Sequence, residues 1–531
     1  MTIQYPHYRE ILAEHSAAWS DFYALTMGQA AHTLGINRDV ITMHAFIRSA
    51  PFGGSHIVTG GQEVLLEHLQ NYWKFDEIDC ENMRNAMMPN AEGVMERIFT
   101  DEFIDECANT PLDLTIDCMP EGEIAFPDEP IYRVHGRTDQ AWMIEAALLN
   151  ASNSQSLFAT LGARTTYAAQ GSTVLEFGLR RAQDVGGLAP SRGAYIGGIE
   201  ATSNNLAHKY YGIPRRGTFA HAWVMLHEDE MDAFANYAKA MPNSGIFLVD
   251  TYDTLEGVKK AIKACQEYGV ELKGIRLDSG DLAYLSIESR KLLDEEGFSQ
   301  AIVTASNDLD EKIIEDLINN QGAKIDAWGV GTSLVTAKSQ PALGMVYKLG
   351  AVFESGMTAE MVEEIRKRMK AGENPSSENF MREVIKLSED NVKVTIPGEL
   401  DLLRYMTVDA DGKPIKYHSD TIISNLTKDP LDRDWLNRDV ISVHKGDDSL
   451  RKTFTAGTRA YRPLVRAMEN GQRTTPTQTI HQSRERAAQS LGMLDDSHRR
   501  FMNPHRYVVG LEEGLKQKRD FTMMAARGHD I

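Results

Sequence analysis

The amino-acid sequence predicts an α/β protein with a parallel β-sheet at its centre. Two observations predict this class. Short apolar runs alternate with helical patterns between residues 245 and 332, and each pair spans roughly 25–30 residues, the size of one βα unit. Each apolar run is also followed at once by a polar cluster. Serial units with short loops give parallel strands joined by right-handed crossovers, which either close into a barrel or stay an open sheet.

Four strands are expected within this repeat. Their patterns are the segments "GIFLVDTYDT", "ELKGIRLDSGD", "SQAIVTASND" and "KIDAWGVGT". Two earlier apolar runs, residues 172–183 and 215–226, are candidates for two further strands. About six strands are therefore expected, enough for a complete or an incomplete barrel.

Three helices are expected between these strands, over residues 255–269, 282–297 and 309–322. Apolar residues recur in them at helical spacing, and a glycine stands at each predicted end. Asp308 and Glu311 have the spacing of a capping box at the start of the third helix.

The sequence on either side of the repeat has a different character. Residues 120–136 alternate between apolar and polar types, which predicts antiparallel strands, and residues 141–170 form a long, mostly apolar helical pattern. Beyond the repeat, residues 356–378 indicate a charged surface helix with a polar loop, and residues 384–398 have the pattern of a strand. The polar tail contains a linker or loop at residues 473–479.

Composition and charge argue against several classes of protein. The 531 residues carry a formal charge of −20, which disfavours nucleic acid and anionic membranes as main partners. The four cysteines form no CxxC pair, so we expect neither a disulfide framework nor a zinc knuckle, and this fits a reducing compartment. No apolar run approaches the roughly 20 residues of a membrane span, and the N-terminus lacks the apolar stretch of a signal peptide. We expect a soluble cytoplasmic protein.

Six polar clusters occupy the carboxyl ends of the expected strands. In parallel α/β folds these ends meet at one edge of the sheet, where ligands bind. An acidic protein that binds an anionic ligand has to gather its arginines at such an edge. The clusters are Arg180, His221, Asp250, Asp278, Ser306–Asn307 and Gly329–Thr332.

The segment "GIRLDSGDL" contains the densest of these clusters. Arg276 offers a planar, charged donor set that suits phosphate or carboxylate. Asp278 is able to hold Mg²⁺ or to balance a developing positive charge, and Ser279 and Gly280 allow the backbone to approach a ligand. Taken alone, the segment is explained equally well as a polar turn, because Asp, Ser and Gly are ordinary turn residues.

Other candidate residues also have an ordinary structural explanation. His221 fits either a core histidine or a general base or nucleophile toward phosphorus. Phe177 fits either the core or a ring that stacks on a planar ligand beside Arg180, and Tyr23 fits either an amphipathic helix or a similar stacking role. The glycines of "WGVGT" suit a phosphate site at a late loop of a barrel, but short glycine pairs are common.

Ten short segments resemble the nicotinate phosphoribosyltransferase family, in that family's order. The segments are "DFYALTMG", "FIRSAPFGG", "PEGEIAFPDEP", "EFGLRRAQ", "GTFAH", "LVDTYDT", "GIRLDSGDL", "SNDLDE", "WGVGT" and "PALGMVYKLG". The resemblance implies a type II phosphoribosyltransferase fold, in which an irregular, incomplete α/β barrel accompanies an α/β domain built from N-terminal and C-terminal segments. It also implies a homodimer with active sites at the interface.

The resemblance implies three regions along the chain. Residues 1–150 form an N-terminal α/β domain, completed by about residues 380–460. Residues 151–350 form the catalytic barrel, and residues 351–531 form a C-terminal region with an insertion helix and a tail.

The chain departs from the family pattern in three places. The insertion near residues 356–378 is longer than the family pattern suggests, and the last 70 residues match no part of that pattern. Asn391 and Glu399 stand where lysines are common.

The resemblance assigns residues to the pyridine base. Tyr23 of the partner subunit and Phe177 sandwich the ring, and Arg276 meets the nicotinate carboxylate or the ribose phosphate. An amide-selective site carries a carboxylate to accept from the NH₂ group, and Thr202 and Ser203 stand where we expect that carboxylate. This favours nicotinate over nicotinamide, although the acidic Glu200 is close in sequence.

Further residues are assigned to the phosphates. Arg180 and Asp278 lie by the pyrophosphate and its Mg²⁺, with Asp250 as a second carboxylate near the metal. His221 matches the histidine that ATP phosphorylates. The ribose 5-phosphate is cradled by Ser306, Asn307, Gly329, Gly331 and Thr332.

The implied reaction joins nicotinate to 5-phosphoribosyl 1-pyrophosphate (PRPP), giving nicotinate mononucleotide and pyrophosphate in the salvage route to NAD. Mg²⁺ is the implied cofactor and ATP a co-substrate. Three alternatives stay open: nicotinamide phosphoribosyltransferase, a barrel isomerase or aldolase acting on a sugar phosphate, and a non-catalytic ligand-binding homologue. The joint presence of Arg276, Asp278 and His221 argues against the last of these.

Overall fold

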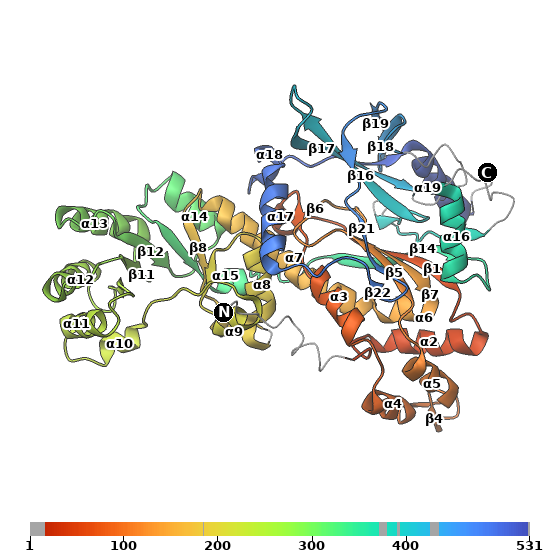
Figure 1. Ribbon diagram of the computed structural model, residues 1–531, viewed down its shortest axis with the longest axis horizontal. Helices are drawn as coiled ribbons and strands as arrows, with labels where there is room; N and C mark the ends of the chain where they lie inside the picture. The colour runs from red at the N-terminus through yellow and green to blue at the C-terminus, as the bar shows by residue number, and fades with distance from the viewer. Residues whose placement is uncertain (1–15, 184, 371–379, 390–392, 425–434, 529–531) are drawn as a thin grey trace. The chain divides into compact units, whose positions relative to one another are not determined.

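A computed structural model describes residues 16–183, 185–370, 380–389, 393–424 and 435–528, which form two compact units (Figure 1). Leu157–Ala342 makes up the first, here called the parallel-sheet unit. The described residues of His7–Ser156 and Leu343–Ile531 make up the second, here called the two-segment unit.

The parallel-sheet unit is built on a six-stranded sheet in which every neighbouring pair is parallel. The described strands leave β10 and β9 at the two edges, and the predicted α/β class with a parallel sheet is confirmed. In spatial order the strands are β10 (Ile246–Leu248), β11 (Gly274–Leu277), β12 (Ile302–Ser306), β13 (Ala327–Val330), β8 (Thr173–Glu176) and β9 (Ala201–Thr202).

Helices connect these strands, and in the sequence 245–332 they fall where the repeat predicts them (Figure 1). The apolar side of each helix packs on the sheet, which is why apolar residues recur at helical spacing in all three. The helices of this unit are α8 (Leu188–Ile196), α9 (Asn205–Tyr211), α10 (His221–Met225), α11 (Glu230–Ala240), α12 (Thr254–Tyr268), α13 (Leu282–Glu295), α14 (Glu311–Asn319) and α15 (Thr332–Val335).

The strand predicted over residues 215–226 is wrong. Arg215 makes only an isolated parallel bridge to Thr202, and His221 begins helix α10. Pro214 has no N–H to offer a ladder, which limits pairing at this point of the chain. The sixth strand is instead β9, whose two residues are too few to give a sequence signal.

The capping box predicted for α14 is also wrong. Asp308 has φ +45°, whereas an N-cap residue needs extended backbone. Asp310 caps the helix, because its side chain accepts from the N–H groups of Lys312 and Ile313 at 3.0 and 2.9 Å.

The two-segment unit contains a seven-stranded antiparallel sheet drawn from both ends of the chain. Strand β1 pairs with β7 on one side and with β14, about 300 residues later, on the other. The spatial order is β15 (Met381–Glu383), β14 (Met345–Phe353), β1 (Val40–Ile47), β7 (Tyr132–Arg137), β5 (Leu114–Cys118), β21 (Val465–Glu469) and β22 (Gln472–Arg473).

A second, six-stranded sheet of this unit comes entirely from the C-terminal part of the chain. Its pairs are antiparallel except β17 with β23, which are parallel. The order is β19 (Asp447–Phe454), β18 (Val440–His444), β23 (Val509–Glu512), β17 (Pro414–Ser424), β16 (Leu400–Val408) and β20 (Ala460–Tyr461).

The helices of the two-segment unit lie mainly near its N- and C-terminal ends. One long helix, α7 (Glu145–Ala168), continues from this unit into the parallel-sheet unit. The others are α2 (Phe22–Leu34), α3 (Gln62–Asn71), α4 (Glu77–Arg84), α5 (Asp101–Asn109), α6 (Thr138–Met143), α16 (Ala359–Lys370), α17 (Ile480–Gly492), α18 (Asp496–Arg499) and α19 (Glu513–Ala526).

Most predictions for the flanking regions are confirmed. Residues 120–136 contain β6 (Ile124–Ala125) and β7, both in antiparallel pairs, and residues 141–170 hold the end of α6 and the whole of α7. The strand predicted over 384–398 is wrong: β15 and β16 lie on either side, and no strand crosses the described residues between them; residues 390–392 lie outside the described residues.

The chain's tail is more ordered than its polarity suggests. It contributes strands β20 to β23 and three helices. The segment predicted as a linker or loop is a short connection: Arg473 ends β22, and Thr479 caps α17 in a capping box with Gln482.

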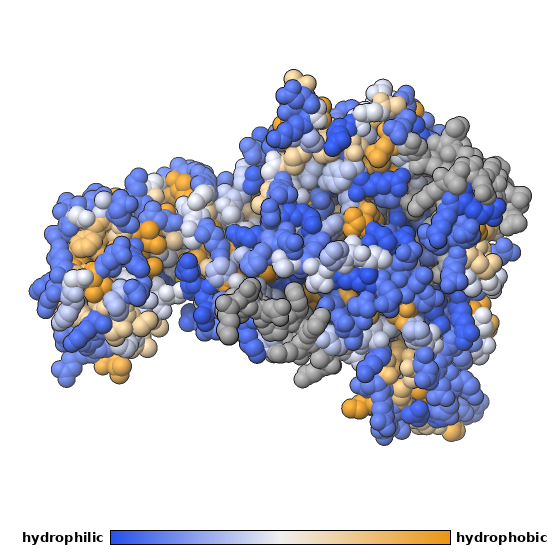
Figure 2. Space-filling view, viewed as in Figure 1, coloured by the Kyte–Doolittle hydropathy of each residue, from blue (hydrophilic) through white to orange (hydrophobic). Residues whose placement is uncertain are grey.

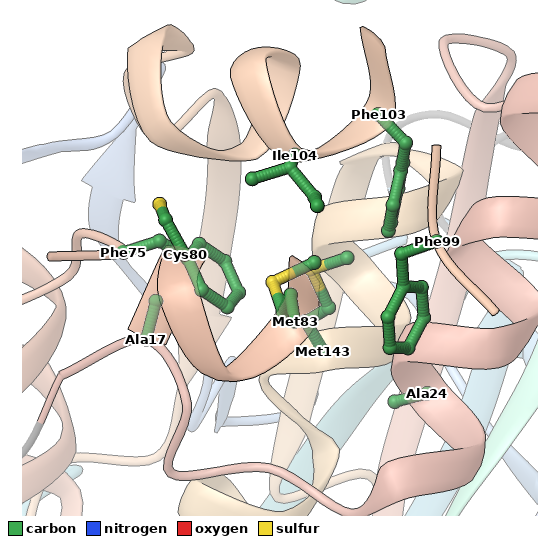
Figure 3. Close-up of a cluster of buried hydrophobic side chains, with 9 residues drawn as sticks. All are labelled: Ala17, Ala24, Phe75, Cys80, Met83, Phe99, Phe103, Ile104 and Met143. Carbon is green, nitrogen blue, oxygen red and sulfur yellow. The ribbon is translucent and has the colours of Figure 1, made fainter. Parts of the chain in front are cut away.

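A buried apolar cluster holds the N-terminal helices of the two-segment unit together (Figure 3). Phe99 and Phe103 stack with ring centroids 6.0 Å apart, and Met83 and Met143 lie beside them. Burying this apolar surface favours folding by about 25 cal/mol for each Å² removed from water.

The visible surface is mostly hydrophilic, with hydrophobic residues in small separate groups (Figure 2). One such group lies on the hairpin of β3 (Met87–Pro89) and β4 (Met95–Arg97), where Met88 is 53% exposed. Of the described helices, none combines the length and the apolar character that crossing a membrane requires.

Candidate functional site

Polar residues line up along one edge of the parallel sheet because of the strand register. Arg276 pairs with Thr304 of the next strand, Ser306 pairs with Gly329, and Glu176 pairs with both Val330 and Thr202. The residues that follow these positions therefore leave the sheet at the same edge. The sequence predicts this arrangement, because a polar cluster stands at the carboxyl end of each expected strand.

Arg276 is the centre of the edge. Its guanidinium donates to the hydroxyls of Ser306 and Thr218 at 2.9 and 3.2 Å, and to the Asp278 carboxylate at 2.8 Å. The group also lies 5.5 Å from the centre of the Phe177 ring. A guanidinium held by three partners is fixed in orientation, and the side chain remains 19% exposed, so it is open to a ligand.

Asp278 is ionised and held between neighbours. Burial alone would raise the pKa of this carboxyl, but the hydrogen bond from Ser306 and the charge of Arg276 outweigh it and lower the pKa below its ordinary value. Its second oxygen, Oδ2, lies 3.6 Å from Nε2 of His221. Asp278 thus links the arginine to the histidine.

Asp250 stabilises the backbone of the same loop. Its Oδ2 accepts from the N–H of Asp278 at 2.9 Å and from the hydroxyl of Ser279 at 2.6 Å. The side chain is buried, and Oδ1 has no hydrogen-bond partner among the described residues. A buried oxygen without a partner is costly, so this position favours a bound cation or water there.

His221 stands at the first position of α10, and it is not a core histidine. Its Nδ1 lies 3.1 Å from the hydroxyl of Thr251, while Nε2 faces Asp278. The side chain is 38% exposed, which leaves the ring accessible to a ligand.

Phe177 continues strand β8 at the site, and Gly329 of the neighbouring strand makes room for it. A Cβ at Gly329 would lie 2.6 Å from the Phe177 ring and 3.2 Å from Cβ of Ser306. Any side chain at this position would push the ring or the serine aside, so the glycine is required by packing.

The loops after β11 and β12 have unusual backbone, and the loop after β13 leaves open space. Asn307 has φ +101° and Asp308 φ +45°, conformations that favour glycine and cost free energy in other residues. Gly280 also has positive φ, at +80°. A Cβ at Gly331 would meet nothing closer than 3.6 Å, so the space beside Gly331 and Thr332 is open on that side.

Thr202 and Ser203 differ sharply in accessibility. The Thr202 hydroxyl is buried; it donates to Glu176 at 2.5 Å and accepts from the N–H of Asn204 at 2.9 Å. Ser203 is exposed. The Glu200 carboxylate accepts from Thr173 at the opposite end of β8, so it points away from the strand ends.

Two further predicted residues are accessible. Arg180 is exposed in a 3₁₀ turn, Leu179–Arg181, directly after Phe177. Tyr23 belongs to the two-segment unit, where it is 45% exposed on α2 and donates to Glu145 at 2.9 Å. Burial and then that contact raise the pKa of Tyr23 to about 12, so its hydroxyl stays protonated.

The sequence patterns missed four residues of this edge: Glu176, Asn204, Thr218 and Thr251. The threonines and the asparagine resemble ordinary loop residues, so no sequence signal marks them. Glu176 did leave a signal, because an acidic residue inside the apolar run "TVLEF" requires a partner when that run is a buried strand.

Capping separates the acidic residues of the strand ends into two kinds. Asp253 and Asp281 accept from backbone N–H groups of α12 and α13 and so serve as N-caps. Asp250 and Asp278 cap no described helix, and their oxygens face the loop and the site. The second kind is available for chemistry.

These features define the class of protein: an α/β enzyme whose site lies at the carboxyl ends of a parallel sheet. The family profiles match most of the chain. The nicotinate phosphoribosyltransferase N-terminal domain matches residues 19–153, the nicotinate phosphoribosyltransferase family 173–389, and the nicotinate phosphoribosyltransferase C-terminal domain 418–519.

Individual proteins agree with these profiles. Nicotinate phosphoribosyltransferase of Bacillus subtilis is 40% identical over 389 residues, covering 72% of both chains, and that of Caenorhabditis elegans is 31% identical, covering 94% of this chain and 92% of its own. The crystal structure of human nicotinic acid phosphoribosyltransferase superposes with a TM-score of 0.74 at 25% identity, covering 94% of this chain and 99% of the human one. The chain belongs to the nicotinate phosphoribosyltransferase family.

Proposed function

We propose that this protein joins nicotinate to PRPP, giving nicotinate mononucleotide and pyrophosphate, in the salvage route to NAD in the cytoplasm. The observation that carries the proposal is the connected set of Arg276, Asp278, His221 and Asp250 at the strand ends. The names of the relatives support the choice of substrates.

The reaction needs compensation for positive charge. The ring nitrogen of nicotinate attacks the anomeric carbon, the bond to pyrophosphate breaks, and positive charge develops on the ribose. The lowered pKa of Asp278 keeps this carboxylate ionised at neutral pH, so it is suited to stabilise that charge. Arg276 supplies fixed donors for an anionic group of the substrate.

The donor set is compatible with Mg²⁺. Within the described residues no group of three or more His, Cys, Asp and Glu side chains is arranged to hold a metal ion. Mg²⁺ is commonly held by one or two carboxylates together with substrate phosphates, and the unpartnered Oδ1 of Asp250 and the carboxylate of Asp278 suit this mode. When bound, the ion would compensate the charge of the leaving pyrophosphate.

His221 is proposed as the residue that ATP phosphorylates. The accessible ring is suited to attack the γ-phosphorus, with ADP as the leaving group and a P–N bond formed. We predict that His221→Ala abolishes stimulation by ATP while some ATP-independent synthesis remains. Pyrophosphate release with and without ATP measures this; full stimulation of the variant would remove His221 from the role.

The remaining contacts complete the proposal. Phe177 and Tyr23 of the partner subunit sandwich the base in a homodimer, and Thr202 and Ser203 line its substituent. Arg180 lies by the pyrophosphate. Ser279 and Gly280 contact the substrate, and the positive φ of Gly280 supports close approach of the backbone. The ribose 5-phosphate is cradled by Ser306, Asn307, Gly329, Gly331 and Thr332, where the open space beside Gly331 supports close approach.

A product assay tests the function directly. PRPP and Mg²⁺ are supplied with nicotinate or nicotinamide, with and without ATP, and both mononucleotide and pyrophosphate are measured. Nicotinate mononucleotide with stoichiometric pyrophosphate is the expected result. Faster turnover of nicotinamide, or no pyrophosphate from either base, would overturn the proposal.

A further inference from the structure

A buried carboxylate stands at the carboxyl end of β8. Glu176 is 1% exposed, and each of its oxygens accepts hydrogen bonds. Oε1 accepts from the N–H of Gly178 at 2.5 Å, and Oε2 accepts from the hydroxyls of Ser191 and Thr202 at 2.8 and 2.5 Å. Burying a carboxylate is costly unless such donors surround it, so the three donors are held to it strongly.

The donors come from three different segments. Gly178 belongs to the turn after β8, Ser191 to α8, and Thr202 to the end of β9. Asn204 extends the network, because its side chain donates to the Gly186 carbonyl at 2.6 Å and to Ser191 at 3.3 Å. The same side chain caps α9. One carboxylate therefore joins three segments beside the end of β8, and Asn204 adds the start of α9 to them.

The segments that Glu176 joins are those that carry the proposed base contacts. Phe177 is the next residue along the chain, and the N–H of Ser203 donates to the Glu176 carbonyl at 2.9 Å. The carboxylate itself is turned to protein donors and away from solvent. Its effect on a ligand would pass through the positions of Phe177 and the Thr202–Ser203 turn.

We propose that Glu176 is a positioning residue that fixes the Phe177–Gly178 turn relative to the Thr202–Ser203 turn and so sets the affinity for the pyridine base. This inference rests on the proposed function. It differs from a purely structural role in one respect: the effect falls mainly on the base, because among the described residues no hydrogen bond joins this network to Arg276, Asp278 or Asp250, which hold the other side of the site.

The first test is Glu176→Gln. A carboxamide keeps one oxygen for the Gly178 N–H, but its NH₂ group only donates, so the hydroxyls of Ser191 and Thr202 lose the acceptor to which they donate. We expect the KM for nicotinate to rise about tenfold, the scale of one lost hydrogen bond, and the KM for PRPP to rise less, because Arg180 is the one residue of this turn that is assigned to PRPP. Equal KM values for nicotinate in variant and wild type, or a parallel rise for both substrates, would overturn the inference. Glu295→Gln, an exposed glutamate of α13, is the matched control.

The second test separates the effect of the Thr202 hydroxyl from the effect of the shape of the side chain. Thr202→Val removes the hydroxyl that Glu176 holds, and we expect it to weaken nicotinate binding as Glu176→Gln does. Thr202→Ser returns the hydroxyl and is expected to restore most of that loss. Equal loss in both Thr202 variants would mean that shape, not the hydrogen bond to Glu176, is responsible.

Amide hydrogen exchange separates failure of the inference from failure of the proposed function. In Glu176→Gln we expect exchange to accelerate in peptides covering residues 177–187 and 201–206, with the rest of the parallel-sheet unit unchanged. This readout needs no substrate. Wild-type protein that releases no pyrophosphate would end the proposed function alone, whereas unchanged local exchange in the variant would end the inference alone.

Discussion

Two arginine-centred clusters, one in each unit, use the same side chain for different purposes. Arg404 of the two-segment unit is fully buried and meets three carboxylates, Glu123, Glu129 and Asp420, at 3.0, 3.2 and 2.7 Å. Arg276 of the parallel-sheet unit is 19% exposed and meets one carboxylate, Asp278. The first arginine is saturated by the protein, and the second keeps access to a ligand.

The electrostatics of the two clusters follow from this difference. Burial alone would lower the pKa of Arg404, but the charges of Asp420 and Glu129 hold it well above its usual value. Burial first, and then the excess negative charge of three carboxylates around one cation, raise the pKa of Glu129. At the site, the arginine and the serine instead lower the pKa of Asp278 and keep it ionised. Saturation and burial mark the structural cluster, and partial exposure marks the functional one.

The largest expected effect comes from breaking the structural cluster. Arg404→Met leaves three buried carboxylates without their cation, and we expect the free energy of unfolding to fall by about 3–5 kcal/mol. Urea unfolding measures this loss. Arg451→Met removes an exposed arginine that pairs with Glu513, and it should cost about 0–1 kcal/mol. Similar losses in the two variants would mean that the buried cluster is not what stabilises this unit.

At the functional cluster we expect a smaller effect, which changes the rate of turnover and not the stability of the fold. Asp278→Asn removes the charge proposed to stabilise the ribose cation, and kcat should fall by at least about a hundredfold. The unfolding midpoint should stay close to that of the wild type, because the site is partly exposed. Asp232→Asn, at an exposed position of α11, is the control. A near-normal rate in Asp278→Asn would remove this carboxylate from the mechanism.

The functional cluster was largely predictable from the sequence, and the structural one was not. Arg276 lies near the end of a strand, and Asp278 and Asp250 follow strands, in a regular repeat with short loops, so their common edge follows from topology alone. Arg404 meets Glu123 and Glu129, which are 281 and 275 residues away in the chain, and no local pattern links such positions.

Within the site, prediction from the sequence was limited for the same reason. "LVDTYDT" contains two aspartates, and only the structure separates Asp250, which holds the Asp278 loop, from Asp253, which caps a helix. The partners of His221 and Arg276, Thr251 and Thr218, are single hydroxyls in loops. Such contacts depend on where the side chains lie after folding. The sequence of a turn does not indicate those positions.

The smallest expected effect is the pH dependence of the structural cluster. Burial first, and then the charge of Asp420, raise the pKa of Glu129 well above its ordinary value. Between the ordinary value of about 4.3 and that raised pKa, the folded protein holds a proton that the unfolded chain releases. This contribution to stability is therefore complete below the ordinary pKa and is lost as the pH rises through the raised one.

Glu129→Gln keeps the shape without a titrating proton, so we expect its free energy of unfolding to fall less steeply with rising pH. Unfolding curves at a series of pH values, with exposed Glu485→Gln as control, measure the slope; identical slopes in Glu129→Gln and wild type would mean that another group takes up the excess charge around Arg404.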